Sequence, residues 1–433
     1  MSAEARVIRG RILSFRDDPA EAGTFARLYL ENGAVLIANG RIEAVGEARE
    51  VLSRAPDGTA VDDHSDCLVM PGFIDAHIHY PQTQVIGSYG AQLLDWLHNY
   101  TFVEEQKFAD PDHCARIAEF FLDELIRCGT TTAMVYCTVH PPSVDAFFSA
   151  AERRGARMIA GKTMMDRDAP EALTDTAERG YDESKSLIER WRRRGRLDYA
   201  VTPRFAITSS QAQLEAAGAL ADEFPGVYVQ THLDENQAEI DLVARLFPGT
   251  RTYLEVYERA GLLGPRSVFG HCIHLADSEV AALTASRSVA AFCPTSNLFL
   301  GSGLFDRARL RNAGVRIALA TDVGGGTSYS MLRTAAEGYK VLQLNGQSWP
   351  AAEAFYQMTL GNARALSLDS RIGSIEVGME ADLIVLNARA TPAMAHRMEA
   401  ANGDLDVELF ALITMGDDRA VRQTYVAGQP RKA

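Results

Sequence analysis

Apolar runs of strand length recur through the middle of the chain, separated by longer stretches rich in alanine and polar residues. They occupy residues 68–79, 130–137, 157–165, 197–205, 227–233, 267–275, 289–297 and 315–323. Short apolar runs favour buried strands, and the intervening stretches are long enough for helices. Eight strands alternating with helices predict an α/β fold, a (β/α)8 TIM barrel, which we expect to span residues 67–372.

A doubly wound parallel sheet would show the same alternation of strands and helices. That fold binds phosphates with a glycine-rich turn between a strand and a helix. The run Gly324-Gly325-Gly326 lacks the required spacing and follows the last strand. The pattern therefore favours the barrel.

Both ends of the chain alternate in the manner of strands. An Asn39-Gly40 pair between two such runs is a hairpin signal, and further short runs lie at 382–386 and 424–428. Isolated hairpins are marginally stable, so the two ends need each other. We expect residues 1–66 and 373–433 to form one small β-sandwich domain beside the barrel.

Composition narrows the class of protein. A chain of 433 residues, 47% hydrophobic and 23% charged, can bury a large core. The net charge of -14 argues against a nucleic-acid partner and suits a small neutral ligand. Six cysteines scattered without a CxxC pair, no signal peptide and no apolar run of about 18 residues predict a cytoplasmic protein without a membrane partner.

Histidines and one aspartate gather at the predicted C-terminal ends of strands, where barrel enzymes place their active sites. His77 and His79 end the first run, and alternate residues of a strand face the same side. His232 ends the fifth run, and Asp322 lies at the end of the eighth. Two histidines alone do not make a metal site, but three imidazoles and a carboxylate suit zinc or iron(II) with a position open for water.

The sixth run carries two histidines, His271 and His274, three residues apart. Residues at that spacing on a strand face opposite sides, so we expect only His271 to reach the pocket and His274 to pack or cap. The other histidines fall in predicted loops and helices and are assigned surface or structural roles: His64, His98, His113, His140 and His396.

Besides the strand with His77 and His79, five segments carry a family resemblance: 90–102, 202–205, 232–236, 293–297 and 321–332. Together they resemble the amidohydrolase superfamily and, within it, the guanine deaminases, over nearly the whole chain. The motifs around His77 and Asp322 are general to the superfamily. The segment from Thr202 to Phe205 and the His-x-x-Glu-Asn motif that begins at His232 are much more selective.

The resemblance implies hydrolytic deamination of guanine to xanthine and ammonia in purine catabolism, on one Zn2+ per chain, with Fe2+ as the alternative metal. It also implies a homodimer. The metal ligands would be His77, His79, His232 and Asp322. Glu235 would shuttle protons, while His271 and Asp322 would hold the attacking water.

The number of metals also follows from the resemblance. Binuclear relatives use a carboxylated lysine on the fourth strand. No lysine lies in 201–205, and Lys162 on the third strand is assigned a structural role. A single metal is therefore expected.

The resemblance further implies substrate contacts from Gln82, Arg204 and Phe205. The planar donors of Arg204 fit the O6 and N7 acceptors of guanine, and Phe205 can stack on a purine. Neighbouring strand residues face opposite sides, so both can reach one ligand only where the strand has become a loop. Trp96 lies in a segment with helical spacing, which predicts a packed helix; as a further hypothesis, Trp96 covers the ligand as part of a lid.

Two other functions are compatible with the pattern. A related amidohydrolase could use the same metal chemistry on another amino-heterocycle, such as 8-oxoguanine, cytosine or an aminotriazine. A relative without catalysis could serve as a scaffold, although the complete set from His77 to Asp322 argues against it. The unrelated zinc deaminases carry HxE and PCxxC motifs and are excluded because neither motif occurs.

Overall fold

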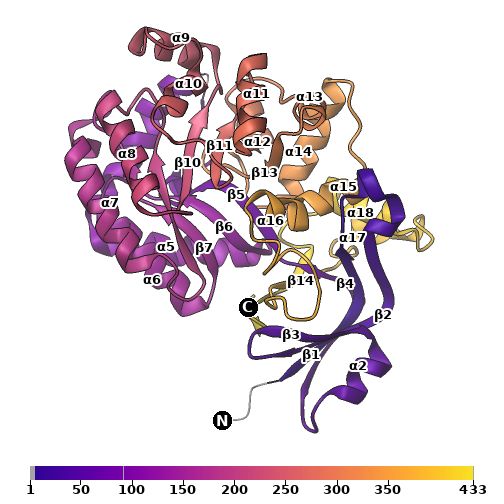
Figure 1. Cartoon of the computed structure of the whole chain (residues 1–433). Helices are drawn as coiled ribbons and strands as arrows, with labels where there is room; N and C mark the ends of the chain where they lie inside the picture. Colours follow the sequence, from indigo (N-terminus) through magenta and orange to yellow (C-terminus); the bar gives the residue numbers. More distant parts are fainter. Residues whose placement is uncertain (1–4, 91, 433) are drawn as a thin grey trace.

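The computed structural model describes residues 5–90 and 92–432, which form a barrel and a separate terminal sheet (Figure 1). Neighbouring strands of the barrel are parallel, in the spatial order of the chain. Its strands are β5 (Phe73–His79), β6 (Thr130–Tyr136), β7 (Arg157–Gly161), β9 (Leu197–Pro203), β10 (Tyr228–Leu233), β11 (Ser267–His271), β12 (Val289–Phe292) and β13 (Arg316–Leu319). The two-residue strand β8 (Thr163–Met164) pairs with β9. The predicted barrel is confirmed.

Helices cover the outside of the barrel (Figure 1). The main ones are α5 (Pro111–Arg127), α6 (Pro141–Arg154), α7 (Ala177–Trp191), α8 (Gln211–Glu223), α9 (Gln237–Leu246), α10 (Tyr253–Arg259), α11 (Asp277–Ser286), α13 (Arg307–Asn312) and α14 (Met331–Leu344). The start of α5 is encoded locally, because the Asp110 side chain accepts from Asp112 N and Pro111 occupies the first turn. None of the helices in the described residues is long and apolar enough to cross a bilayer.

The two ends of the chain form one seven-stranded mixed sheet, which confirms that they build a small β domain together. Its strands are β1 (Arg6–Phe15), β2 (Arg27–Ala38), β3 (Arg41–Glu47), β4 (Ala60–Pro71), β14 (Leu383–Leu386), β15 (Val421–Val426) and β16 (Gln429–Pro430). The two ends join where β4 pairs antiparallel with β14. Asn39 and Gly40 both have positive φ between β2 and β3, as the hairpin signal predicted.

The first predicted strand, 68–79, is in fact two strands. Its first part belongs to β4 in the terminal sheet, and the barrel strand β5 begins at Phe73. Gly72 lies between them, and a Cβ at that position would meet the Thr131 hydroxyl at 2.1 Å. Only glycine therefore fits where the chain enters the barrel. The domain limits 1–66 with 373–433 and 67–372 stay predictions.

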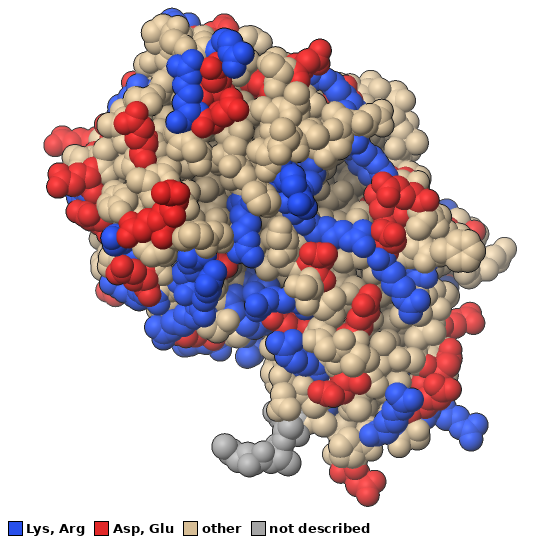
Figure 2. Space-filling model, in the orientation of Figure 1, with Lys and Arg blue, Asp and Glu red and all other residues tan. Residues whose placement is uncertain are grey.

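Buried ion pairs join the terminal sheet to the barrel. Glu380 accepts from Arg157 Nε at 2.8 Å and from Arg196 Nε at 2.9 Å, and Asp382 pairs with Arg196. Elsewhere on the surface, acidic and basic side chains are interspersed over the face shown in Figure 2. Because Glu380 and Arg157 are both buried, this junction has a defined geometry that exposed pairs lack.

The barrel closes between its first and last strands through the segment that follows β13. Asp322 N donates to the His77 carbonyl at 2.9 Å, and His79 N donates to the Val323 carbonyl at 2.8 Å. These two bonds place the residues after β13 directly against the end of β5. They bring three of the predicted ligands to one point of the barrel rim.

Buried side chains reinforce this closure below the rim. The Asp75 carboxylate accepts from Thr321 N at 3.0 Å and from the Thr321 hydroxyl. Asn362, the first residue of α16 (Asn362–Ala365), donates to the carbonyls of Ile74 at 2.6 Å and Leu319 at 2.7 Å. Its Oδ1 accepts from Leu319 N at 2.8 Å. One fully buried amide therefore clamps β5 to β13.

We predict that Asn362→Ala destabilises the protein strongly. The change leaves the two carbonyls and the Leu319 N–H without this partner in a dry interior, at a cost of roughly 2–5 kcal/mol in the free energy of unfolding. Asn32→Ala, which removes an exposed amide paired with Arg9, is the matched control. Thermal unfolding of the two variants measures the difference. Equal midpoints would show that Asn362 does not hold the barrel closed.

Candidate active site

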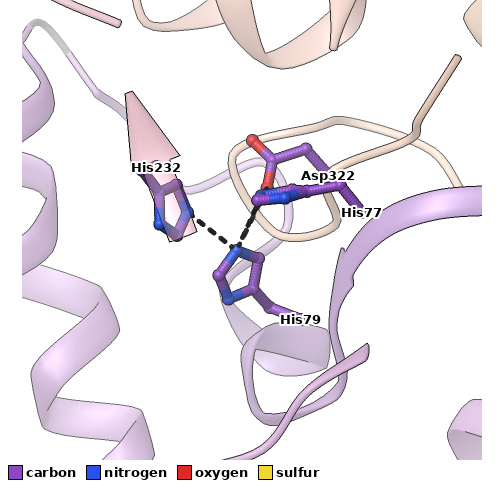
Figure 3. Close-up of side chains that lie close together, drawn as sticks. All are labelled: His77, His79, His232 and Asp322. Carbon is purple, nitrogen blue, oxygen red and sulfur yellow. Dashed lines mark hydrogen bonds and ion pairs between the residues drawn. The ribbon is translucent and has the colours of Figure 1, made fainter. Parts of the chain in front are cut away.

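His77 and His79 project from the end of β5 to the same side, as their spacing predicted (Figure 3). Their Nε2 atoms lie 3.3 Å apart, and both side chains are buried. The His77 ring is accommodated by Gly270 on β11, where a Cβ would lie 2.6 Å from His77 Cε1. The glycine that precedes His271 in the sequence is therefore required by the His77 ring, which comes from β5, a strand that does not pair with β11.

Two more side chains complete the cluster. His232 at the end of β10 places Nε2 3.3 Å from His79 Nε2, and Asp322 Oδ1 lies 3.3 Å from Nε2 of both His77 and His79 (Figure 3). Ligand atoms about 2.0–2.1 Å from a tetrahedral zinc ion lie about 3.3–3.4 Å from one another. Four of the six separations among the donor atoms have this value, and all four atoms lie within 4.8 Å of one another, so they could bind one small cation.

The protonation of these groups suits a metal. Burial lowers the pKa of His79 to about 3 and that of His232 well below its usual value, so both rings are neutral. His232 Nδ1 donates to the Arg204 carbonyl at 2.7 Å, which leaves its Nε2 lone pair free. Burial raises the pKa of Asp322, but its contacts with His77 and His79 outweigh this and hold the pKa well below the usual range.

Backbone conformation also marks this rim of the barrel. Asp322 has φ +52° and His271 has φ +71°, in the left-handed region that residues with a Cβ rarely adopt. Each such residue costs of order 1–3 kcal/mol and persists only where its surroundings hold it. The strain is located at residues whose side chains face the cluster.

His271 and Glu235 lie next to the four donors. His271 Nε2 is 3.3 Å from Glu235 Oε2 and 3.7 Å from Asp322 Oδ2. Asn297 Oδ1 accepts a hydrogen bond from His271 Nδ1 at 2.8 Å. The proton is therefore on Nδ1, and the lone pair of Nε2 faces the two carboxyl groups. As expected, His271 rather than His274 faces the pocket; His274 Nε2 donates to the Ser302 carbonyl at 2.8 Å.

The surroundings of Glu235 raise the pKa of its carboxyl group. Burial, followed by the charge of Asp322, raises the pKa of Glu235 to about 8. Ser302 Oγ donates to Glu235 Oε1 at 3.0 Å. A hydroxyl can donate to a carboxylate or accept from a carboxylic acid, so this contact serves both protonation states. A carboxyl group with a pKa near neutrality is suited to general acid–base chemistry.

The cluster opens into a pocket. All four predicted substrate contacts line it: Gln82, Trp96, Arg204 and Phe205. Leu93, Leu97 and Leu300 supply apolar walls. A mostly apolar pocket with a few directed polar groups is the usual form of a small-molecule site.

The requirement for Arg204 and Phe205 to face one ligand is met, because β9 ends at Pro203 and both residues follow the strand. Trp96 ends α3 (Leu93–Trp96) and is 3% exposed. It is therefore both a packed helical residue and part of the pocket wall. Lys162 is fully buried in a pair with Asp175 and does not line the pocket, as its structural assignment predicted.

Two side chains at the site were not predicted, Glu105 and Ser302, whereas the polar residues of 293–297, which include Asn297, were expected to orient the site. The segment 293–297 was expected to end the seventh strand, but β12 ends at Phe292 and Asn297 lies in α12 (Pro294–Phe299). Pro294 has no N–H to donate between strands and fits the first turn of a helix. This proline was the feature of the sequence that indicated a helix at Pro294–Phe299. Glu105 and Ser302 carried no signal, because their partners are distant in sequence.

Comparison with known proteins identifies relatives of the whole chain. The amidohydrolase family description matches residues 68–431, and a short match to an imidazolonepropionase-like composite domain of bacteria covers residues 33–57. The guanine deaminase of Escherichia coli (strain K12) is 46% identical over 427 residues, which are 98% of this chain and 97% of that protein.

Solved structures of related enzymes have the same fold as this chain. The structure of E. coli guanine deaminase superposes with a TM-score of 0.96 at 46% identity and covers 98% of this chain and 99% of that chain. Guanine deaminase from C. acetobutylicum with guanine bound in the active site has a TM-score of 0.88 at 26% identity, covering 98% and 99%. An adenosine deaminase from Xanthomonas campestris with bound zinc has a TM-score of 0.84 at 25% identity, covering 98% and 92%.

The residues at the strand ends, the buried carboxyl group beside them and these matches lead to one assignment. The chain belongs to the amidohydrolase family.

Proposed function

We propose that the protein is a zinc-dependent guanine deaminase, which hydrolyses guanine to xanthine and ammonia in purine catabolism. One observation carries the proposal: a single pocket combines the four-donor cluster and Glu235 with Gln82, Arg204 and Phe205. The names of the relatives support the choice of guanine among amino-heterocycles.

In this proposal one Zn2+, or Fe2+ as the alternative, is held by His77, His79, His232 and Asp322. When bound, the metal lowers the pKa of a water molecule to near neutrality and so supplies hydroxide for attack on the ring. The donor set fits because three imidazoles and one carboxylate are ligands that zinc prefers.

The chain's own residues move the protons. In the reaction a C2–O bond forms, the bond from C2 to the 2-amino group breaks, and the amino group leaves as ammonia. Glu235 takes one proton from the attacking water and delivers it to the ring nitrogen. It then takes the second proton of that water, from the hydroxyl now bonded to C2, and delivers it to the departing amino group. His271 and Asp322 orient the water, and Asn297 keeps the His271 Nε2 lone pair directed toward it. Such acid–base assistance contributes about 100- to 10,000-fold to the rate.

Recognition would come from the polar and aromatic walls. Arg204 offers planar donors to the O6 and N7 acceptors of guanine, and Gln82 can donate and accept on another edge. Phe205 and Trp96 supply apolar faces for the purine. We further propose a homodimer in the cytoplasm; the buried, unpaired state of all six cysteines suits a reducing compartment.

The test is ammonia release from purified, zinc-replete protein supplied in parallel with guanine, adenine, cytosine and 8-oxoguanine, with xanthine followed by absorbance. We expect turnover of guanine in preference to the other bases. If the protein deaminates another base but not guanine, the proposed mechanism stands and the proposed substrate is wrong. No turnover of any base by zinc-loaded protein would favour the scaffold function.

Glu235→Gln tests the proton shuttle in the same assay. The amide preserves the shape of the side chain but cannot carry the proton, so kcat should fall by at least about 100-fold. Zinc content measured by elemental analysis should stay at the wild-type level. Glu215→Gln on the exposed face of α8 is the control and should retain full activity. Turnover within threefold of wild type by Glu235→Gln would remove Glu235 from the mechanism.

Metal removal gives a second test. Dialysis against a strong chelator should abolish guanine turnover and lower the midpoint of thermal unfolding, because the donors of the cluster then lose the ion that binds only the folded state. Addition of Zn2+ should restore both properties. Full activity after removal of all metal, verified by elemental analysis, would contradict the proposal.

The wall formed by Trp96 can be tested through binding. Trp96→Ala opens the pocket next to Leu93 and removes an aromatic face, so KM for guanine should rise by about tenfold or more. Trp96→Phe keeps an aromatic ring and should recover most of the affinity. An unchanged KM and kcat in Trp96→Ala would show that this residue only packs within its helix.

A further inference from the structure

A buried glutamate, Glu105, lies behind Gln82 and Arg204 in the wall of the pocket. Glu105 ends α4 (Phe102–Glu105) and is 1% exposed. Its Oε1 accepts from Gln82 Nε2 at 3.1 Å and from Arg204 Nη1 at 2.9 Å, while Oε2 lies 2.8 Å from the same Arg204 nitrogen. Glu105 itself does not line the pocket. One carboxylate therefore positions both Gln82 and Arg204, the side chains that would form hydrogen bonds with a ligand.

Glu105 determines which way the Gln82 amide faces. Gln82 Nε2 donates to Glu105, and Gln82 Oε1 accepts from Gly324 N at 3.2 Å. The reversed amide would place its oxygen against the carboxylate and its N–H₂ against an N–H group, losing both bonds. The carboxylate and the backbone amide thus fix the positions of the donor and acceptor that Gln82 presents to the pocket.

Glu105 also neutralises Arg204. Only Nη1 of Arg204 binds the carboxylate, and its guanidinium carbon lies 5.4 Å from the centre of the Phe102 ring. Nε and Nη2 have no hydrogen-bond partner in the described part of the chain, so these are the donors left for a ligand. With its charge balanced at close range, Arg204 acts as a neutral donor pair rather than as an anion receptor.

We propose that Glu105 is a specificity-determining positioning residue: by balancing Arg204 and orienting Gln82, it makes the pocket select a neutral purine over an anionic one. This inference rests on the proposed function. The distinction matters for a guanine deaminase, because its dioxopurine product carries a more acidic ring N–H than guanine. An unbalanced Arg204 would bind the product anion and retain it. Glu105 thus favours product release.

Two substitutions separate charge from position. Glu105→Gln removes the charge, and Glu105→Asp keeps the charge but withdraws it from Gln82 and Arg204. Glu104→Gln is the matched control, because Glu104 is the neighbouring buried glutamate on the same helix and pairs instead with Lys107. Circular dichroism and zinc content establish that each variant is folded and loaded.

Inhibition of guanine turnover is measured with xanthine and with hypoxanthine at pH 6 and pH 8.5. Hypoxanthine is neutral at pH 6 and stays mostly neutral at pH 8.5, whereas xanthine is mostly anionic there, so the ratio of the two inhibition constants removes any titration of the enzyme itself. For Glu105→Gln we expect KM for guanine to rise about 10- to 100-fold, the range for losing charge-assisted hydrogen bonds. Xanthine should become at least about fivefold more potent relative to hypoxanthine at pH 8.5, but not at pH 6.

Glu105→Asp should raise KM while leaving the xanthine-to-hypoxanthine ratio as in the wild type, and Glu104→Gln should change neither. A wild-type ratio in folded Glu105→Gln would overturn the proposal. If Glu105→Gln does not fold, Glu105→Asp decides, because a wild-type KM in that variant would also overturn it. Failure of the wild-type protein to deaminate guanine would instead refute the underlying function.

Discussion

Closure of the barrel between β5 and the segment after β13 is the contact on which the site depends. The bonds from Asp322 N to the His77 carbonyl and from His79 N to the Val323 carbonyl join residues separated by most of the chain. The same segments carry three of the four side chains of the candidate metal site. Because backbone pairing and ligand placement use the same positions, a barrel that closes correctly has its metal cluster already assembled.

The closed rim also concentrates buried acids and imidazoles in a small volume. Burial lowers the pKa of His79 to about 3, so that ring is neutral, and raises the pKa of Glu235 to about 8, close to neutrality. Behind the pocket wall, the carboxylate of Glu105 pairs with the guanidinium of Arg204. In the proposed function, the site therefore separates a region that would bind a cation and transfer protons from a region that would recognise an uncharged ring.

Much of this could be predicted, for physical reasons that differ from one residue to the next. The eight barrel strands were visible because each is buried and therefore apolar, and the alternation of a strand placed His77 beside His79. Gly72 ended a strand inside one apolar run, which hydrophobicity alone could not show. Asn362 and Glu105 act on partners far away in sequence, so no local pattern marked them. The folded structure was needed to bring those partners together.

Anomalous X-ray diffraction at the zinc edge from crystals grown with zinc and guanine would test the central claim most directly. The account predicts one zinc ion per chain, bound by Nε2 of His77, His79 and His232 and by Asp322, with guanine between Phe205 and the edge formed by Gln82 and Arg204. Zinc bound instead by the alternative group of His271 and Cys293, or guanine located outside this pocket, would contradict it.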